Sequence, residues 1–178
     1  MKKITFFIIS VFIHTLALAQ YKPAEQGSTL QFTIQNLGFD VHGSFSGFKG
    51  NINFDAQNPA TASFDVSIDA ATVNTDNSLR DSHLKDDGYF DVKNYPTIHF
   101  VSSKVTTAGK VGVYNMTGKL TIKNKTADIS FPFTATPSGD GYLLKGSFKI
   151  NRKDYGVGGT STISNQLEVF LNIIAKKG

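Results

Sequence analysis

The side chains best suited to chemistry lie close together in one short segment of the chain. Arg80, Asp81 and His83 bring together a cation, a carboxylate and an imidazole, which are groups that general acid–base catalysis uses. The same residues also suit a structural role, in which Arg80 fixes a long connection through carboxylates and backbone carbonyls. We favour the structural role, and catalysis by these three residues is the alternative.

Other patterns that mark catalytic or metal sites are missing from the sequence. No two of the histidines that follow residue 19, at positions 42, 83 and 99, have the spacing of a metal-binding pair. The segment 43–47 (GSFSG) lacks the central serine of a nucleophile elbow. The chain has no cysteine, so it has no thiol for a disulfide or for lipoprotein acylation. We therefore predict no catalytic residue, no metal site and no cofactor.

Phenylalanine is the residue type in which the chain is rich, with fifteen copies and no tryptophan. At least seven of them fall on apolar faces of the patterns described below: Phe32, Phe54, Phe64, Phe100, Phe131, Phe133 and Phe148. Each alone would be an ordinary core residue. Glycines at positions 43, 47, 50, 118 and 146 lie in or beside the same patterns, where glycine usually marks a bend or bulge that curves a sheet. A curved sheet with an aromatic inner face suits a cavity for an apolar ligand.

The elements that position these side chains are predicted to be strands. Apolar and polar residues alternate in about eight or nine runs, for example over 29–35, 63–69 and 129–133. A period of two indicates strands with one apolar face, and the Gly, Asn, Asp and Pro between the runs indicate an antiparallel all-β domain. Only Asp76 to Lys85 lacks alternation, and we expect a short helix there within one long connection.

Three architectures accommodate eight such strands. A two-sheet sandwich buries its apolar faces against each other, and a closed barrel turns them into a lumen. An outer-membrane barrel would place them outside, but the runs are mostly shorter than the roughly nine to eleven residues that membrane strands need. We prefer the closed barrel, although alternation alone leaves the sandwich open.

The N-terminus has the pattern of a secretory signal. Lys2 and Lys3 precede a short apolar run over 4–13, and Ala17 and Ala19 offer small residues before a cleavage site. We predict a signal peptide over 1–19 and one domain over 20–178, exported to the periplasm, because the lack of cysteine suits a bacterial periplasmic protein. Removal of the signal lowers the formal charge of +4 by two, and no arginine-rich cluster indicates nucleic-acid binding.

Several segments together resemble the YceI-like family. The central signature lies in 79–84 (LRDSHL), 89–92 (YFDV) and 95–100 (YPTIHF); the glycine–phenylalanine pattern of 38–50, the strand 118–122 (GKLTI) and the segment 148–156 (FKINRKDYG) agree with it in order. The resemblance covers about residues 20–176. It implies an eight-stranded, lipocalin-like antiparallel barrel that binds a polyisoprenoid or related lipid in its lumen. It also implies periplasmic members linked to isoprenoid quinones or stress, and it carries over no catalytic residue.

The resulting hypothesis is a non-enzymatic carrier or reservoir for a long apolar lipid: a polyisoprenoid, an isoprenoid quinone or a fatty-acid derivative. Met116 joins the candidates because its flexible thioether adapts to irregular ligands. The predicted lumen residues are Phe32, Phe45, Phe64, Phe100, Met116, Phe131, Phe133, Phe148 and Leu171. We expect the segment from Leu79 to Pro96 to pack beside the mouth and gate it.

Transient contact with a membrane or membrane protein, and a homodimer, are compatible with this hypothesis. The alternatives are an enzyme for a lipid-linked substrate and a stress or adhesion module with a filled barrel.

Overall fold

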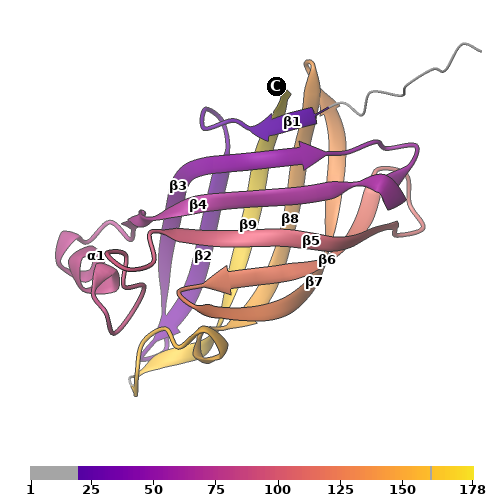
Figure 1. Cartoon of the computed structure of the whole chain (residues 1–178). Helices are drawn as coiled ribbons and strands as arrows, with labels where there is room; N and C mark the ends of the chain where they lie inside the picture. Colours follow the sequence, from indigo (N-terminus) through magenta and orange to yellow (C-terminus); the bar gives the residue numbers. More distant parts are fainter. Residues whose placement is uncertain (1–19, 161) are drawn as a thin grey trace, which may run out of the picture.

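The chain forms one antiparallel sheet that closes on itself (Figure 1). The computed structural model describes residues 20–160 and 162–178, so the predicted signal peptide lies outside the described residues. One α-helix, α1 (Ser78–Lys85), and two short 3-10 helices, η1 (Pro59–Thr61) and η2 (Arg152–Tyr155), lie in the connections. The strands are β1 (Gln20–Pro23), β2 (Thr29–Asn36), β3 (Phe39–Asn53), β4 (Ser63–Asn74), β5 (Thr97–Thr107), β6 (Val113–Ile122), β7 (Lys125–Ser138), β8 (Gly141–Asn151) and β9 (Ile163–Lys177).

The closed barrel is built by the strands from β2 to β9. Sheet order runs β3-β2-β9-β8-β7-β6-β5-β4, and pairing of β3 with β4 completes the circle. The short β1 pairs with the ends of both β3 and β9. The prediction of an eight-stranded antiparallel barrel with one short helical segment is therefore confirmed, and the sandwich is excluded. β1 is an addition that the alternation did not reveal.

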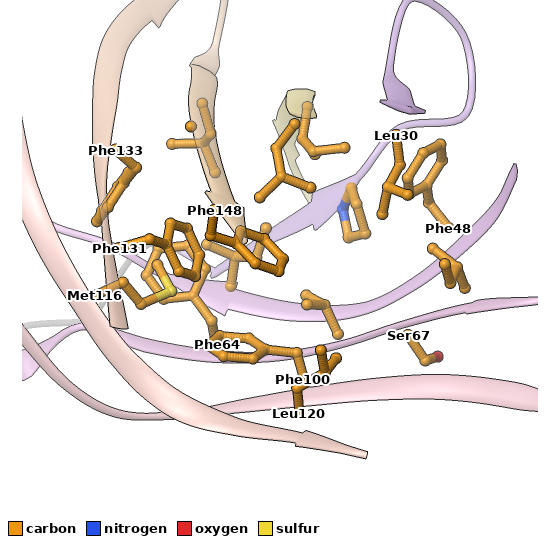
Figure 2. Close-up of a pocket in the computed structure, with 18 of the residues that line it drawn as sticks. Leu30, Phe48, Phe64, Ser67, Phe100, Met116, Leu120, Phe131, Phe133 and Phe148 are labelled. Atoms are coloured by element: carbon orange, nitrogen blue, oxygen red, sulfur yellow. The ribbon is translucent and has the colours of Figure 1, made fainter. Parts of the chain in front are cut away.

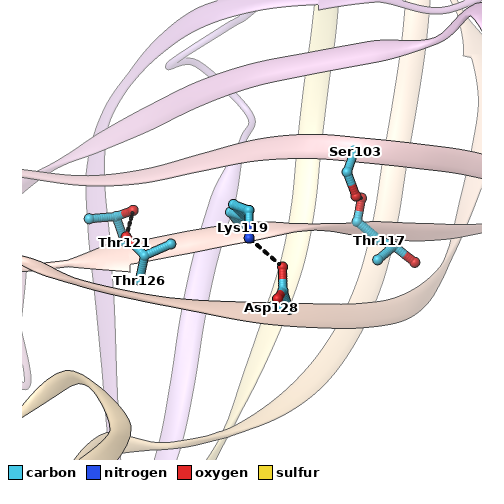
Figure 3. Close-up of polar contacts among 6 residues, drawn as sticks. All are labelled: Ser103, Thr117, Lys119, Thr121, Thr126 and Asp128. Atoms are coloured by element: carbon cyan, nitrogen blue, oxygen red, sulfur yellow. Dashed lines mark hydrogen bonds and ion pairs between the residues drawn. The ribbon is translucent and has the colours of Figure 1, made fainter.

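Alternation places apolar side chains on one face of each strand and polar side chains on the other. Along β6, Tyr114, Met116 and Leu120 are buried inside, whereas Asn115 and Lys119 are exposed outside. The outer face carries short polar contacts between neighbouring strands, as Figure 3 shows for β5, β6 and β7. These are Lys119 Nζ to Asp128 Oδ1 at 3.0 Å, the Thr121 and Thr126 hydroxyls at 2.7 Å, and Ser103 Oγ to the Thr117 carbonyl at 3.2 Å. The apolar side of the sheet thus faces the lumen.

The glycines singled out in the sequence serve two different purposes. A Cβ on Gly43 would lie 2.3 Å from the ring of Phe32, and a Cβ on Gly118 would lie 2.5 Å from the ring of Phe100. These two glycines give each ring a place to lie against the strand. Gly47 and Gly50 have φ of +75° and +123°, and the register of β3 against β4 shifts beside them. They form the predicted bulge.

The helix begins at a well-formed cap and lies in the one long connection, between β4 and β5. The side chain of Asn77 accepts a hydrogen bond from the backbone nitrogen of Arg80 at 3.0 Å, which is the usual N-cap contact. α1 lies at one end of the barrel (Figure 1). Within the described part of the chain, no helix has the length and apolar character that crossing a bilayer requires.

Candidate functional site

Two packed clusters occupy the two ends of the barrel interior. One, which we call the helix end, lies under α1 and η2; its buried members include Phe32, Phe45, Ile122, Tyr155 and Val169. The other, the aromatic end, includes Tyr21, Phe54, Phe64, Tyr114 and Phe133. Partly buried residues in the middle of the barrel pack against both clusters: Phe100, Ile129, Phe148 and Leu171. The middle is therefore where the two clusters meet.

An apolar cavity lies in this middle region, between the two clusters. Its volume is about 140 Å³. Figure 2 shows Leu30 and Phe48 on one side of the cavity and Phe131, Phe133 and Met116 on the other. Polar residues in the lining are only Ser67, His99 and Lys145, and all other lining residues are apolar or glycine. The cavity thus offers dispersion contact and desolvation to a ligand, with little polar recognition.

Seven of the nine predicted lumen residues line this cavity. They are Phe64, Phe100, Met116, Phe131, Phe133, Phe148 and Leu171. The other two are placed elsewhere, because Phe32 lies over Gly43 and Phe45 packs edge-on against Phe90 at 5.3 Å, both within the helix end. Phe32 and Phe45 therefore lie in the barrel interior but outside the cavity lining, and their contact with a ligand stays a prediction. Whether the seven lining residues contact a ligand stays a prediction.

Some lining residues were not among the predicted ones. Leu30, Val66 and Ile129 line the cavity. They lie on apolar strand faces that the alternation identifies, so a list of every apolar residue on each face, and not mainly the phenylalanines, would have included them. Phe48 is different. Phe45 points inward, and strict alternation would therefore turn Phe48 outward. The bulge at Gly47 reverses the pattern, which a period-two argument cannot foresee.

The helix end is fixed by a buried arginine. Arg152 is 5% exposed, and its guanidinium donates to the carbonyls of Ser164 at 2.9 Å, Val157 at 2.8 Å and Ile163 at 3.0 Å. Charge-assisted bonds of this kind to several carbonyls hold the η2 turn against the start of β9. Burial also raises the pKa of Tyr155 in the same turn to about 12. This end of the barrel is thus closed by a rigid turn.

The Arg80, Asp81 and His83 segment is engaged in local structure and lies outside the cavity lining. Arg80 Nε donates to Thr75 Oγ1 and its Nη2 donates to the Thr75 carbonyl, both at 2.7 Å. Asp81 Oδ1 accepts from the Thr75 nitrogen at 2.9 Å and from the Thr75 hydroxyl. His83 is exposed. Arg80 and Asp81 therefore converge on the buried Thr75 at the end of β4, while His83 lies apart from that contact.

The architecture and the cavity together define a class of protein. The chain is one of the small antiparallel β-barrels whose interior accommodates side chains or one small ligand. The YceI-like domain matches residues 21–175, and the chain belongs to the YceI-like family. The resemblance based on the segments from Leu79 to Phe100 is confirmed.

Relatives and solved structures agree with this assignment. A UPF0312 protein of Pseudomonas putida strain W619 is 28% identical over 166 residues, which cover 87% of this chain and 85% of that protein. The crystal structure of Burkholderia cenocepacia BcnA has a TM-score of 0.80 and 26% identity, over 85% of this chain and 98% of that one. A Campylobacter jejuni YceI protein has a TM-score of 0.68 and 26% identity, over 100% and 99%. A polyisoprenoid binding domain from Saccharophagus degradans has a TM-score of 0.72, 15% identity, and covers 91% of this chain and 100% of that one.

Proposed function

We propose that this protein binds a long apolar lipid in the barrel lumen and acts as a carrier or reservoir for it. The observation that supports the proposal is the apolar cavity between the two packed clusters. Its lining is apolar apart from Ser67, His99 and Lys145, as is typical of pockets for apolar ligands. A polyisoprenoid, an isoprenoid quinone or a fatty-acid derivative has the matching chemistry, and the structural neighbour from Saccharophagus degradans is itself described as a polyisoprenoid binding domain.

The energetics of burial favour a long apolar chain as the occupant. Each buried CH₂ contributes roughly 0.8 kcal/mol, so a chain of about sixteen carbons would gain around 13 kcal/mol before the entropy of association is subtracted. The cavity volume of about 140 Å³ is comparable to a cavity of about 150 Å³ that admits benzene. Any long chain, linear or branched, therefore requires movement of lining rings. We expect Phe48, which is only partly buried, to move most.

Catalysis by Arg80, Asp81 and His83 receives less support than binding. A catalytic group must reach the reacting atoms of its substrate, and none of these three residues contributes to the cavity lining. The guanidinium of Arg80 is bonded to Thr75, as a scaffold role requires. A binding function without catalysis is the proposal that fits this geometry.

The proposed setting of the protein is the periplasm, after export directed by residues 1–19. A long apolar lipid has very low solubility as a free molecule in water. Loading and unloading would therefore involve contact with a membrane or with a membrane protein. A homodimer is compatible with this role, and the lumen described here is built from one chain.

The test is the lipid content of protein purified gently from its own host. Native mass spectrometry after organic extraction should find a long-chain lipid with the wild-type protein. Val66→Phe, which places a ring into the cavity from β4, should fold and lose at least about nine-tenths of that lipid, because the ring occupies the space. Val101→Phe is the matched control, since Val101 lies on the outer face of the adjacent strand. Wild-type protein without any lipid, or full lipid retention by Val66→Phe, would contradict the proposal.

A further inference from the structure

The barrel wall is interrupted beside β1. β1 pairs with β3 only at Gln20↔Asn53 and Tyr21↔Ile52, and pairing of β2 with β3 begins at Leu30↔Phe45. Between these two ladders, residues 46–51 of β3 have no backbone pairing with β1 or β2, and the connection over 24–28 reaches Gly47 and Phe48 through Glu25. Regular backbone pairing is therefore missing along this stretch. Pairing is also missing between β7 and β8 beyond Phe133↔Gly146, but there the stacked rings of Phe131 and Phe148, with centroids 4.6 Å apart, span the two strands.

The connection over 24–28 is held very differently on its two sides. On the β9 side, the nitrogen of Ala24 donates to the Ile174 carbonyl at 2.8 Å, and the nitrogen of Ile174 donates to Ser28 Oγ at 2.9 Å. On the β3 side, the hydrogen bonds of this connection are accepted by one exposed carboxylate, that of Glu25. Glu25 Oε2 accepts from the nitrogens of Gly47 at 3.1 Å and Phe48 at 2.9 Å. The β3 side thus depends on a single side chain.

The interruption lies where the cavity reaches the surface. A hollow on the outer surface is bordered by Lys22, Pro23, Phe48, Lys49, Gly50 and Asn51. Pro23 and Phe48 also line the inner cavity, so these two residues separate the hollow from the lumen. Phe48 follows the bulge at Gly47, and Gly50 with its positive φ comes two residues later. This short stretch of β3 therefore has backbone freedom that its neighbours lack.

The two ends of the barrel are poorer routes into the lumen. At the helix end, Arg152 and the packing of Phe45 on Phe90 close the interior. None of the residues over 79–96, the segment expected to gate the mouth, lines the cavity. At the aromatic end, Phe54 makes edge-on contacts with both Tyr114 and Tyr142 at 5.1 Å. Opening either end would break many packed contacts, whereas opening the wall breaks the contacts of Glu25.

We infer that an apolar chain enters and leaves the lumen through the wall, between Pro23 and Phe48, and that Glu25 holds this opening shut. The inference rests on the proposed lipid-binding function. Release of ligand requires the 24–28 connection to separate from β3 while it remains attached to β9. The ligand class is a single apolar chain, because the opening is bounded by one proline and one phenylalanine.

The experiment measures how fast a bound chain escapes. Wild type and variants are loaded with the fluorescent fatty acid cis-parinaric acid and mixed in a stopped-flow instrument with excess phosphatidylcholine vesicles as acceptor. Glu25→Ala should release the probe about tenfold faster, since the charge-assisted bonds to Gly47 and Phe48 are lost. Glu25→Gln keeps an acceptor oxygen and should give an intermediate rate.

Two controls separate the wall from the ends of the barrel. Asp55→Ala also removes a carboxylate bonded to a backbone nitrogen, that of Gln57 at 2.9 Å, away from the opening. Asn77→Ala removes the cap of α1 and loosens the helix end. Both should release the probe within about twofold of the wild-type rate, because a lost cap or turn bond weakens only its own segment. Glu25→Ala at the wild-type rate, or Asn77→Ala as fast as Glu25→Ala, would overturn the inference while leaving lipid binding intact. Failure of wild type to bind the probe would overturn both.

Discussion

The aromatic end and the middle of the barrel are built from the same kind of side chain and have opposite packing. At the aromatic end, Phe54 contacts Phe64, Tyr114, Phe133 and Tyr142 with ring centroids between 5.1 and 6.2 Å, which leaves the interior filled. In the middle, the rings lie against the wall or against each other, and the centre stays open. Aromatic content therefore does not decide whether a barrel is hollow. What decides it is whether each ring has a place to lie along the wall.

The details in the middle of the barrel support this explanation. Phe100 lies over Gly118, and Phe131 and Phe148 stack with centroids 4.6 Å apart and an interplanar angle of 30°. A ring that lies over glycine or parallel to another ring projects less far into the lumen. Edge-to-face rings at the aromatic end project toward one another and make favourable quadrupole contacts. Three predictions test this contrast, and the last of them extends it to the outer face.

The largest effect is expected at the aromatic end. Phe54→Ala should lower the free energy of unfolding by about 3–5 kcal/mol, because the ring is 4% exposed and fully surrounded. Phe148→Ala is the matched substitution in the middle, and it should cost less than half as much, since the Phe148 ring already borders empty space. Urea unfolding with unchanged m-values would measure both. Equal losses at the two positions would mean that the middle is as tightly packed as the end.

An intermediate effect is expected where a ring lies over glycine. Gly118→Ala should destabilise the protein by about 1–3 kcal/mol and reduce probe binding, because its Cβ would push Phe100 toward the cavity. Gly88→Ala is the control, since nothing lies within 4 Å of the position that its Cβ would take. Thermal unfolding and cis-parinaric acid titration of both variants would measure the effects. Unchanged stability and binding in Gly118→Ala would show that Phe100 does not need this glycine.

The smallest effect is expected on the outer face of the same strands. Lys119→Ala removes the ion pair with Asp128, in which both side chains are well exposed (Figure 3). The free energy of unfolding should change by less than about 0.5 kcal/mol, because water and salt screen exposed pairs. Urea unfolding at low and high salt would measure it. A loss above 1 kcal/mol, on the order of an interior substitution, would show that the outer face shares in stabilising the barrel.

Alternation in the sequence was enough to predict most of the fold. The inward faces of β2, β4, β6 and β7 follow from a period of two, and Asp76 to Lys85 stood out as the segment without that period. Closure into a barrel needed more, because a sandwich buries the same faces. The signature around Leu79 to Phe100 supplied the missing information through its resemblance to a family.

The candidate site was less predictable, for two physical reasons. Phe32 and Phe45 satisfy the same pattern as Phe64, and only the closeness of Gly43 and Phe90 assigns them to the helix end. Phe48 is turned inward by a bulge. The glycine at position 47 indicated a bend or bulge there, but a glycine alone does not give the change of phase that follows it. The interruption beside β1 depends on where two ladders end, and this is set by tertiary pairing.

The pairing of β1 with β9 has a consequence for the order of events in folding. Tyr21 pairs with Lys177, and the nitrogen of Gly178 donates to the Gln20 carbonyl at 3.0 Å. Residues that lie far apart in the sequence thus become neighbours. β9 also supplies the partner of β2 and of β8. Pairings between residues so distant in sequence slow folding, because the entropic cost of closing a very long loop comes before any contact that stabilises the closed loop. The barrel therefore cannot close until β9, the last strand in the sequence, is available to join β2 to β8.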